Sequence, residues 1–181
     1  MPGKDSTQIR VGSNGSINVG AAGVVTLPTD INDSLTTGWT DLGYVDDKGV
    51  TLEEGLTIAD IGLWQSFYPG RKIVTARMQT AKFVLAQWNK ANVTLAFGGG
   101  SVATTSNGFI YHPPAPANLD VRSAVVSWQD GTFNYEVVIP RAIVSDNVDT
   151  TLARTDAAYL PITLSTIGTD GSDPWYILTN D

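Results

Sequence analysis

The longest stretch of strand-like sequence lies between residues 73 and 87. β-Branched and aromatic residues are frequent there, and neither Pro nor Gly interrupts it. Such a strand would exceed about 40 Å at about 3.3 Å per residue. In its middle, polar side chains fall on both faces, Arg77 on one and Lys82 on the other; near its end both faces are apolar, with Phe83 on one and Val84 on the other. The pattern predicts a strand in two environments, first a solvated surface or subunit contact and then a packed core.

A short helix is predicted directly after this strand, over residues 89–97. Asn89 is a favourable N-cap because its side chain can accept a hydrogen bond from a free N–H group of the first turn. Trp88 and Val93 have the spacing of a hydrophobic staple, and Gly98 supplies the left-handed residue that ends a helix. We expect Trp88 at the corner and Phe97 on the apolar stripe to anchor the core.

The rest of the chain alternates short apolar runs with turn residues. Short strands are predicted at residues 24–27, 122–129, 133–139, 160–167 and 175–179. Hairpin or loop turns are predicted at residues 46–49, 130–131 and 169–174, Pro140 is expected to end a strand, and the proline-rich segment 101–120 is expected to be irregular. Many strands and one short helix indicate a mainly β, mostly antiparallel domain, either a sandwich or a barrel.

The chain is short enough for one folded domain. Residues 1–23 are rich in Gly, Ser and Asn, which predicts a flexible N-terminal arm with one short strand at most, and residues 24–181 form the expected domain. Segment 53–70 is apolar but is broken by several Gly and Pro residues, so we interpret it as a long contact loop. In that interpretation its aromatic residues Trp64, Phe67 and Tyr68 contact a partner; the alternative is that they pack over the core of their own domain.

Charge is segregated along the chain. The sequence carries a net charge of −7 and no cysteine, which argues against a nucleic-acid reader and excludes disulfides. Acidic residues crowd segment 41–60 and basic residues follow in segment 71–90. Blocks of opposite sign suit copies that meet head to tail, although charges that merely solvate a β surface would also fit. The candidates for an assembly interface are Glu53, Glu54, Asp60, Trp64, Phe67, Tyr68, Arg71, Arg77 and Lys82.

Residues for catalysis are sparse. His112 is the sole histidine and lies in a Pro-rich run, no H-E-x-x-H motif occurs, and Gly98–Ser101 lacks the Lys-Ser/Thr of a phosphate-binding loop. Glu53 with Glu54 or Asp60 could be imagined as a glycosidase pair, but adjacent acids on a turn-rich surface are nearly always solvated charges. We therefore expect no enzyme activity, no cofactor and no metal.

Four stretches, in order along residues 36–181, resemble the major tail tube proteins of long-tailed bacteriophages, especially those that infect actinobacteria. They are GWTDLGYVDDKGV, QWNKANVTLAFGGG, FNYEVVIPRA and LARTDAAYLPITLSTIGTDGSDPWYILT. The resemblance implies two packed antiparallel sheets with one flanking helix. It also implies six-fold rings that stack into a tube, with strands of neighbouring subunits closing a barrel around the lumen.

The resemblance further implies the partners of the chain. These are copies of itself, a tape-measure protein, a tail terminator, tail-tip or baseplate proteins, and double-stranded DNA that passes through the lumen without specific binding. No membrane is expected among the partners. The protein would be in the virion tail, and in the host cytoplasm during assembly. An acidic lumen would keep the phosphate backbone from binding, so the basic segment 71–90 should point away from it or pair with acids of segment 41–60 in the next subunit.

A second interpretation belongs to a different class of protein. A carbohydrate-binding or adhesin-like β-sandwich, such as a phage decoration or receptor-binding protein, would use Trp39, Trp64 and Trp175 as sugar platforms. Self-assembly into tubes would favour the first interpretation, and a monomer retained on glycans would favour the second.

Overall fold

Strands dominate the structure, a computed structural model that describes residues 3–168 and 171–181. The strands in that part of the chain are β1 (Ser13–Ala21), β2 (Thr40–Asp41), β3 (Val45–Ile61), β4 (Arg71–Leu85), β5 (Ser101–Thr105), β6 (Gly108–His112), β7 (Arg122–Asp130), β8 (Phe133–Val144), β9 (Leu160–Thr166) and β10 (Tyr176–Thr179). One α-helix, α1 (Lys90–Ala96), and a short 3₁₀ turn (Ser6–Gln8) complete the secondary structure of the described residues.

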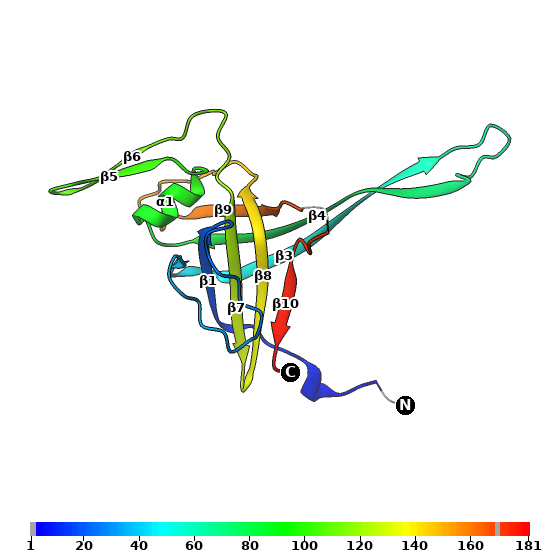
Figure 1. Ribbon diagram of the computed structural model, residues 1–181, viewed down its shortest axis with the longest axis horizontal. Helices are drawn as coiled ribbons and strands as arrows, with labels where there is room; N and C mark the ends of the chain where they lie inside the picture. Colours follow the sequence, from blue (N-terminus) through cyan, green and yellow to red (C-terminus); the bar gives the residue numbers. More distant parts are fainter. Residues whose placement is uncertain (1–2, 169–170) are drawn as a thin grey trace.

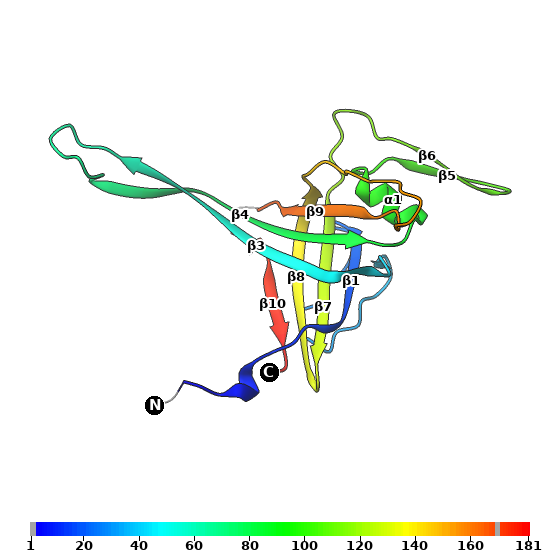
Figure 2. The same ribbon diagram turned by 180° about the vertical axis from the view of Figure 1, so that it is seen from behind.

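The main sheet bends into two crossing layers (Figures 1 and 2). Its strand order is β2-β1-β7-β8-β9-β4-β3, and β10 pairs with β8 beside this path. Strand β8 belongs to both layers, because most of its length pairs with β7 and its last residues, from Ala142 to Val144, also pair with β9. A separate β5–β6 ribbon lies beside α1. The structure thus confirms the predicted mainly β fold with two antiparallel sheets and one short helix.

The core lies between the two layers. The core residues come from both layers, and their apolar side chains are almost completely buried. The largest are Ile17, Leu42, Phe83, Leu85, Val137, Ile139, Leu160, Ile162 and Leu164. Each such side chain that leaves water contributes about 1.5–3 kcal/mol of hydrophobic stabilisation, so this cluster holds the layers together.

Helix α1 forms the corner that the sequence predicts. The Asn89 side chain accepts a hydrogen bond from the Asn92 N–H group, as expected of an N-cap. At the other end Gly98 has a φ of 71°, and the N–H groups of Gly98 and Gly99 bond to the carbonyls of Leu95 and Thr94. This pair of bonds is a Schellman motif, which satisfies the last carbonyls of the helix.

Four sequence predictions are wrong in the first half of the chain. The expected flexible arm 1–23 contains β1, which pairs with both β2 and β7 and places Ile17 in the core. Segment 24–27 is not a strand. The expected turn at 46–49 is a bulge inside β3, where Gly49 adopts a φ of 68°. Residues up to Ile61, taken as part of a loop, extend β3 because β4 pairs with them.

Two further corrections concern the second half. Segment 101–120 is not irregular throughout, since β5 and β6 form a hairpin there. Pro140 does not end β8: Ser123 opposes a bulge that accommodates the proline, and its hydroxyl donates to the Pro140 carbonyl at 2.7 Å. The predicted hairpin of β7 and β8 and the strands at the positions of β9 and β10 are confirmed. The predicted turn at 169–174 includes residues 169–170, which lie outside the described residues.

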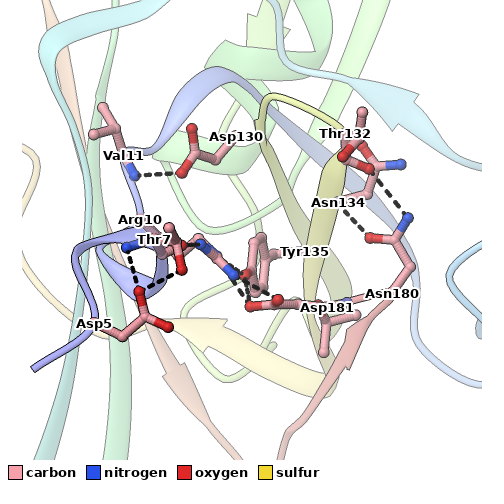
Figure 3. Close-up of polar contacts among 11 residues, drawn as sticks. Asp5, Thr7, Arg10, Val11, Asp130, Thr132, Asn134, Tyr135, Asn180 and Asp181 are labelled. Carbon is pink, nitrogen blue, oxygen red and sulfur yellow. Dashed lines mark hydrogen bonds and ion pairs between the residues drawn. The ribbon is translucent and has the colours of Figure 1, made fainter. Parts of the chain in front are cut away.

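A polar clasp holds the two ends of the chain against the β7–β8 turn (Figure 3). The Arg10 guanidinium donates to the Asp181 carboxylate and to the Tyr135 hydroxyl, and it lies 4.4 Å from the centre of the Phe133 ring. The Tyr135 hydroxyl also donates to the Asp181 carboxylate, and the hydrogen bonds from Arg10 and Tyr135 lower the pKa of the Asp181 side chain. The Val11 N–H group donates to Asp130 at 3.1 Å, which adds a second tie on the same turn.

Candidate assembly interface

The most unusual feature of the molecule is a long ribbon that projects from the body (Figures 1 and 2). Strands β3 and β4 pair with each other far beyond the point where β9 ends, and residues 62–70 join them. We call residues 51–82 the projecting hairpin. Every residue from 51 to 78 is exposed. Beyond the point where β9 ends, both strands of the ribbon are therefore exposed to solvent in the isolated subunit.

Apolar side chains lie on both faces of the projecting hairpin. Directly paired residues of two strands share a face, and faces alternate along each strand. The register places Leu56, Ile58 and Val74 on the face that continues the core side of β4. Met78 and Ile73 fall on the opposite face. All five are exposed, an arrangement that monomeric proteins avoid and partner-binding surfaces use.

The loop at the end of the hairpin carries three exposed aromatic residues. Trp64 is 98% exposed and Phe67 is 107% exposed, so each is as accessible as in an extended chain, and Tyr68 is exposed as well. Residues of this kind are enriched at interfaces because one ring buries a large apolar area at low entropic cost. We call residues 62–70 the tip loop.

Three ion pairs connect the two strands of the projecting hairpin. Lys82 bonds to Glu53 at 2.6 Å, Arg77 to Glu54 at 3.2 Å, and Lys72 to Asp60 at 2.8 Å. The Glu53 contact raises the pKa of Lys82. Exposed pairs of this kind contribute at most about 1 kcal/mol each. The basic segment was expected to pair with acids of the next subunit, whereas these three cations pair with acids of their own subunit.

The nine assembly candidates from the sequence all belong to this one element. Three lie on β3, three in the tip loop and three on β4. Leu56 and Ile58 were recognised as apolar residues of the expected contact loop but were not among the nine candidates, because Gly55 was taken to break a strand there. Their alternation with polar neighbours was the available signal.

The prediction that Trp88 and Phe97 anchor the core is wrong for the subunit. Trp88 is 46% exposed and Phe97 is 43% exposed. Trp88 instead donates from its indole to the Ala158 carbonyl at 2.7 Å, and the Phe97 ring packs 5.7 Å from that of Tyr111. The corner is held by smaller buried residues of α1, such as Val93 and Leu95.

A groove opens at the base of the projecting hairpin, along the seam between β3 and β1. Its volume is about 500 Å³. The seam groove is lined by apolar residues of both layers and by the β3 bulge, including Ile17, Tyr44, Asp46, Asp47, Val50 and Trp128. It exists because β3 and β2 are the two ends of the sheet and do not pair with each other in the described chain.

The three tryptophans considered as sugar platforms do not form a common surface. Trp64 lies in the tip loop, whereas Trp175 packs against the core and Trp39 donates to the Thr26 carbonyl from a loop of the body. Among the described residues, no cluster of three potential metal ligands occurs. In the same part of the chain, no helix is long and apolar enough to cross a membrane.

Comparison with known proteins gives one clear match. A search of curated proteins found nothing similar to the chain. The family described as phage tail tube protein, by contrast, matches residues 1–181, which is the whole sequence. A β body with a projecting hairpin that is apolar on both faces has surfaces suited to contact with other chains. The chain belongs to the phage tail tube protein family and is a structural protein of the phage tail.

Proposed function

We propose that this chain forms six-membered rings that stack into the tail tube, the conduit through which genome DNA leaves the virion. The observation that carries this proposal is the projecting hairpin, which is exposed and apolar on both faces. A ribbon with one apolar face needs one partner surface to bury it, whereas this ribbon needs a partner surface on each of its two faces. Each hairpin is therefore covered by more than one neighbouring subunit, as in a ring stacked on other rings.

The free edge of β3 supports the same assembly. This strand has 17 residues and is the last in its sheet, so its outer N–H and C=O groups have no ladder partner in the described chain. Long exposed edges readily pair with another chain, and closure into a barrel removes such edges altogether. Addition of a neighbour's strand along β3 extends the sheet from one subunit to the next and closes it around a lumen.

Charge supports the passage of DNA. The net charge of −7 gives the tube an acidic character, and basic residues that contacted phosphate would release counterions and hold the genome in place. The three hairpin cations that pair with acids in their own subunit are already neutralised. The tape-measure protein, the tail terminator and the tip or baseplate proteins are the partners of this tube, which assembles in the host cytoplasm.

Electron microscopy and light scattering over a range of protein concentrations test the proposal. We expect rings or tubes above a threshold concentration, with no metal or cofactor added. A matched variant replaces residues 56–77 with an Asn-Gly turn between Gly55 and Met78, which face each other in the ladder. Because the removed residues make no contact with the core, this variant should fold as a monomer and not assemble. Normal tubes from the shortened chain, or a monomer from the full chain even with tail initiator components, would overturn the proposal.

A further inference from the structure

Charge is unevenly divided between the projecting hairpin and the rest of the molecule. The hairpin, residues 51–82, has four basic and three acidic residues, whereas the remainder has seven basic and fifteen acidic residues. Three of the four hairpin cations pair within the hairpin. Arg71 is the fourth, and it forms no ion pair with any described residue. The end of the ribbon therefore carries an uncompensated positive charge beside three exposed aromatic rings.

The seam groove has the complementary character. Asp46, Asp47 and Lys48 all line it, which leaves one net negative charge, and neither aspartate forms an ion pair within the described chain. The apolar side chains of the lining, here called the apolar floor, include Val50, which is only partly buried, and Tyr44, which is largely exposed. An apolar floor together with one net negative charge fits a ligand that combines aromatic rings with one cation.

The tip loop of a subunit cannot occupy the groove of the same subunit. The groove and the tip loop lie at opposite ends of β3, with Asp47 near the start of the strand and Ile61 at its end. Fourteen residues of strand span about 46 Å at about 3.3 Å per residue, and the strand runs outward without turning back (Figures 1 and 2). Only a second copy of the chain can bring a tip loop to this groove.

We propose that the tip loop of one subunit docks in the seam groove of another, with Arg71 against Asp46 and Asp47 and the aromatic rings over the apolar floor. This inference rests on the proposed function and specifies its contact. The two surfaces are different, so the contact is heterologous. Heterologous contacts generate closed rings or open filaments rather than isolated dimers, which is the behaviour that a tube requires.

A charge swap tests the electrostatic part of this contact. Arg71→Glu should raise the concentration needed for assembly about tenfold or more, because like charges then face each other across the contact. The double variant Asp46→Lys/Asp47→Lys should do the same, and all three substitutions together should restore assembly to within about twofold of wild type. Arg154→Glu makes the same charge change at an exposed site of the body and should leave assembly unchanged.

Cross-linking locates the contact directly, because the chain has no cysteine of its own. Tyr68→Cys chains mixed with Lys48→Cys chains should give a covalent dimer with a short bis-maleimide, whereas Tyr68→Cys with Thr151→Cys should not. Failure of the charge swap to restore assembly, together with no Tyr68–Lys48 cross-link in tubes that form normally, would overturn the docking while leaving the tube function intact. Wild-type protein that never assembles would overturn both.

Discussion

Asn92 is the polar residue on which the corner around α1 depends, and its replacement by Ala makes a quantitative prediction. The side chain is completely buried. Its amide nitrogen donates to the Leu42 carbonyl and to the Gln87 carbonyl, each at 2.9 Å. These two bonds join the helix to the chain just before β3 and to the chain just after β4. Asn92→Ala removes both bonds without changing the surface.

The expected loss of stability follows from three contributions. Two carbonyls left without a donor cost about 1–2 kcal/mol each. The space left by the missing amide adds about 1 kcal/mol. The substitution also removes the buried Asn92 Oδ1 atom, which has no hydrogen-bond partner among the described residues, and this stabilises the fold by about 1 kcal/mol. The net loss is about 3 kcal/mol, which for a chain of this size lowers Tm by about 6–12 °C.

Thermal unfolding followed by circular dichroism, at a concentration where the protein is monomeric, measures this loss. Asn118→Ala, at an exposed asparagine, is the matched control and should change Tm by no more than about 2 °C. Asn92→Asp preserves shape but replaces the donor with a carboxylate. Burial raises the pKa of that carboxyl, so the variant should be more stable at pH 4 than at pH 8, where the charged form faces two carbonyls. A change of less than 2 °C for Asn92→Ala would refute the role of these bonds.

Three further changes test other parts of the structure. Burial raises the pKa of Glu136, so the folded state binds its proton more tightly and stability falls as pH rises through that raised value; Glu136→Gln should therefore raise Tm at pH 8 and change it little at pH 4. Gly100→Ala should destabilise the β5–β6 ribbon strongly, because Gly100 has a φ of 99° and a Cβ there would lie 2.3 Å from the His112 carbonyl oxygen; loss of amide protection in the ribbon by hydrogen exchange is the measurement, and an unchanged pattern would contradict it. Trp88→Phe removes the indole donor to Ala158 from a half-exposed site and should cost only about 1 kcal/mol in urea unfolding, in contrast to the collapse expected of a core anchor.

The sequence by itself determined the features that depend on near neighbours in the chain. The corner at Asn89, the left-handed Gly98 and the β7–β8 hairpin each follow from local capping or turn chemistry. The change of character along β4 was also visible, because side-chain alternation reports the surroundings of a strand: residues 71–78 are exposed and Ala81, Phe83 and Leu85 are buried.

Only the tertiary structure decided which segments pair and which apolar residues are covered. Segment 53–61 contains Gly55 and begins a stretch whose Gly and Pro residues favour a loop, yet it is a strand because β4 pairs with it along its length, with one bulge at Thr57/Ile58. Residues 13–21 look like a polar arm, but β7 and β2 on either side make them part of the sheet. Trp88 and Leu56 are both strongly apolar, and nothing local indicates that neither is buried in the subunit. Burial is a property of contacts between distant parts of the chain, and here also of contacts that one chain cannot make alone.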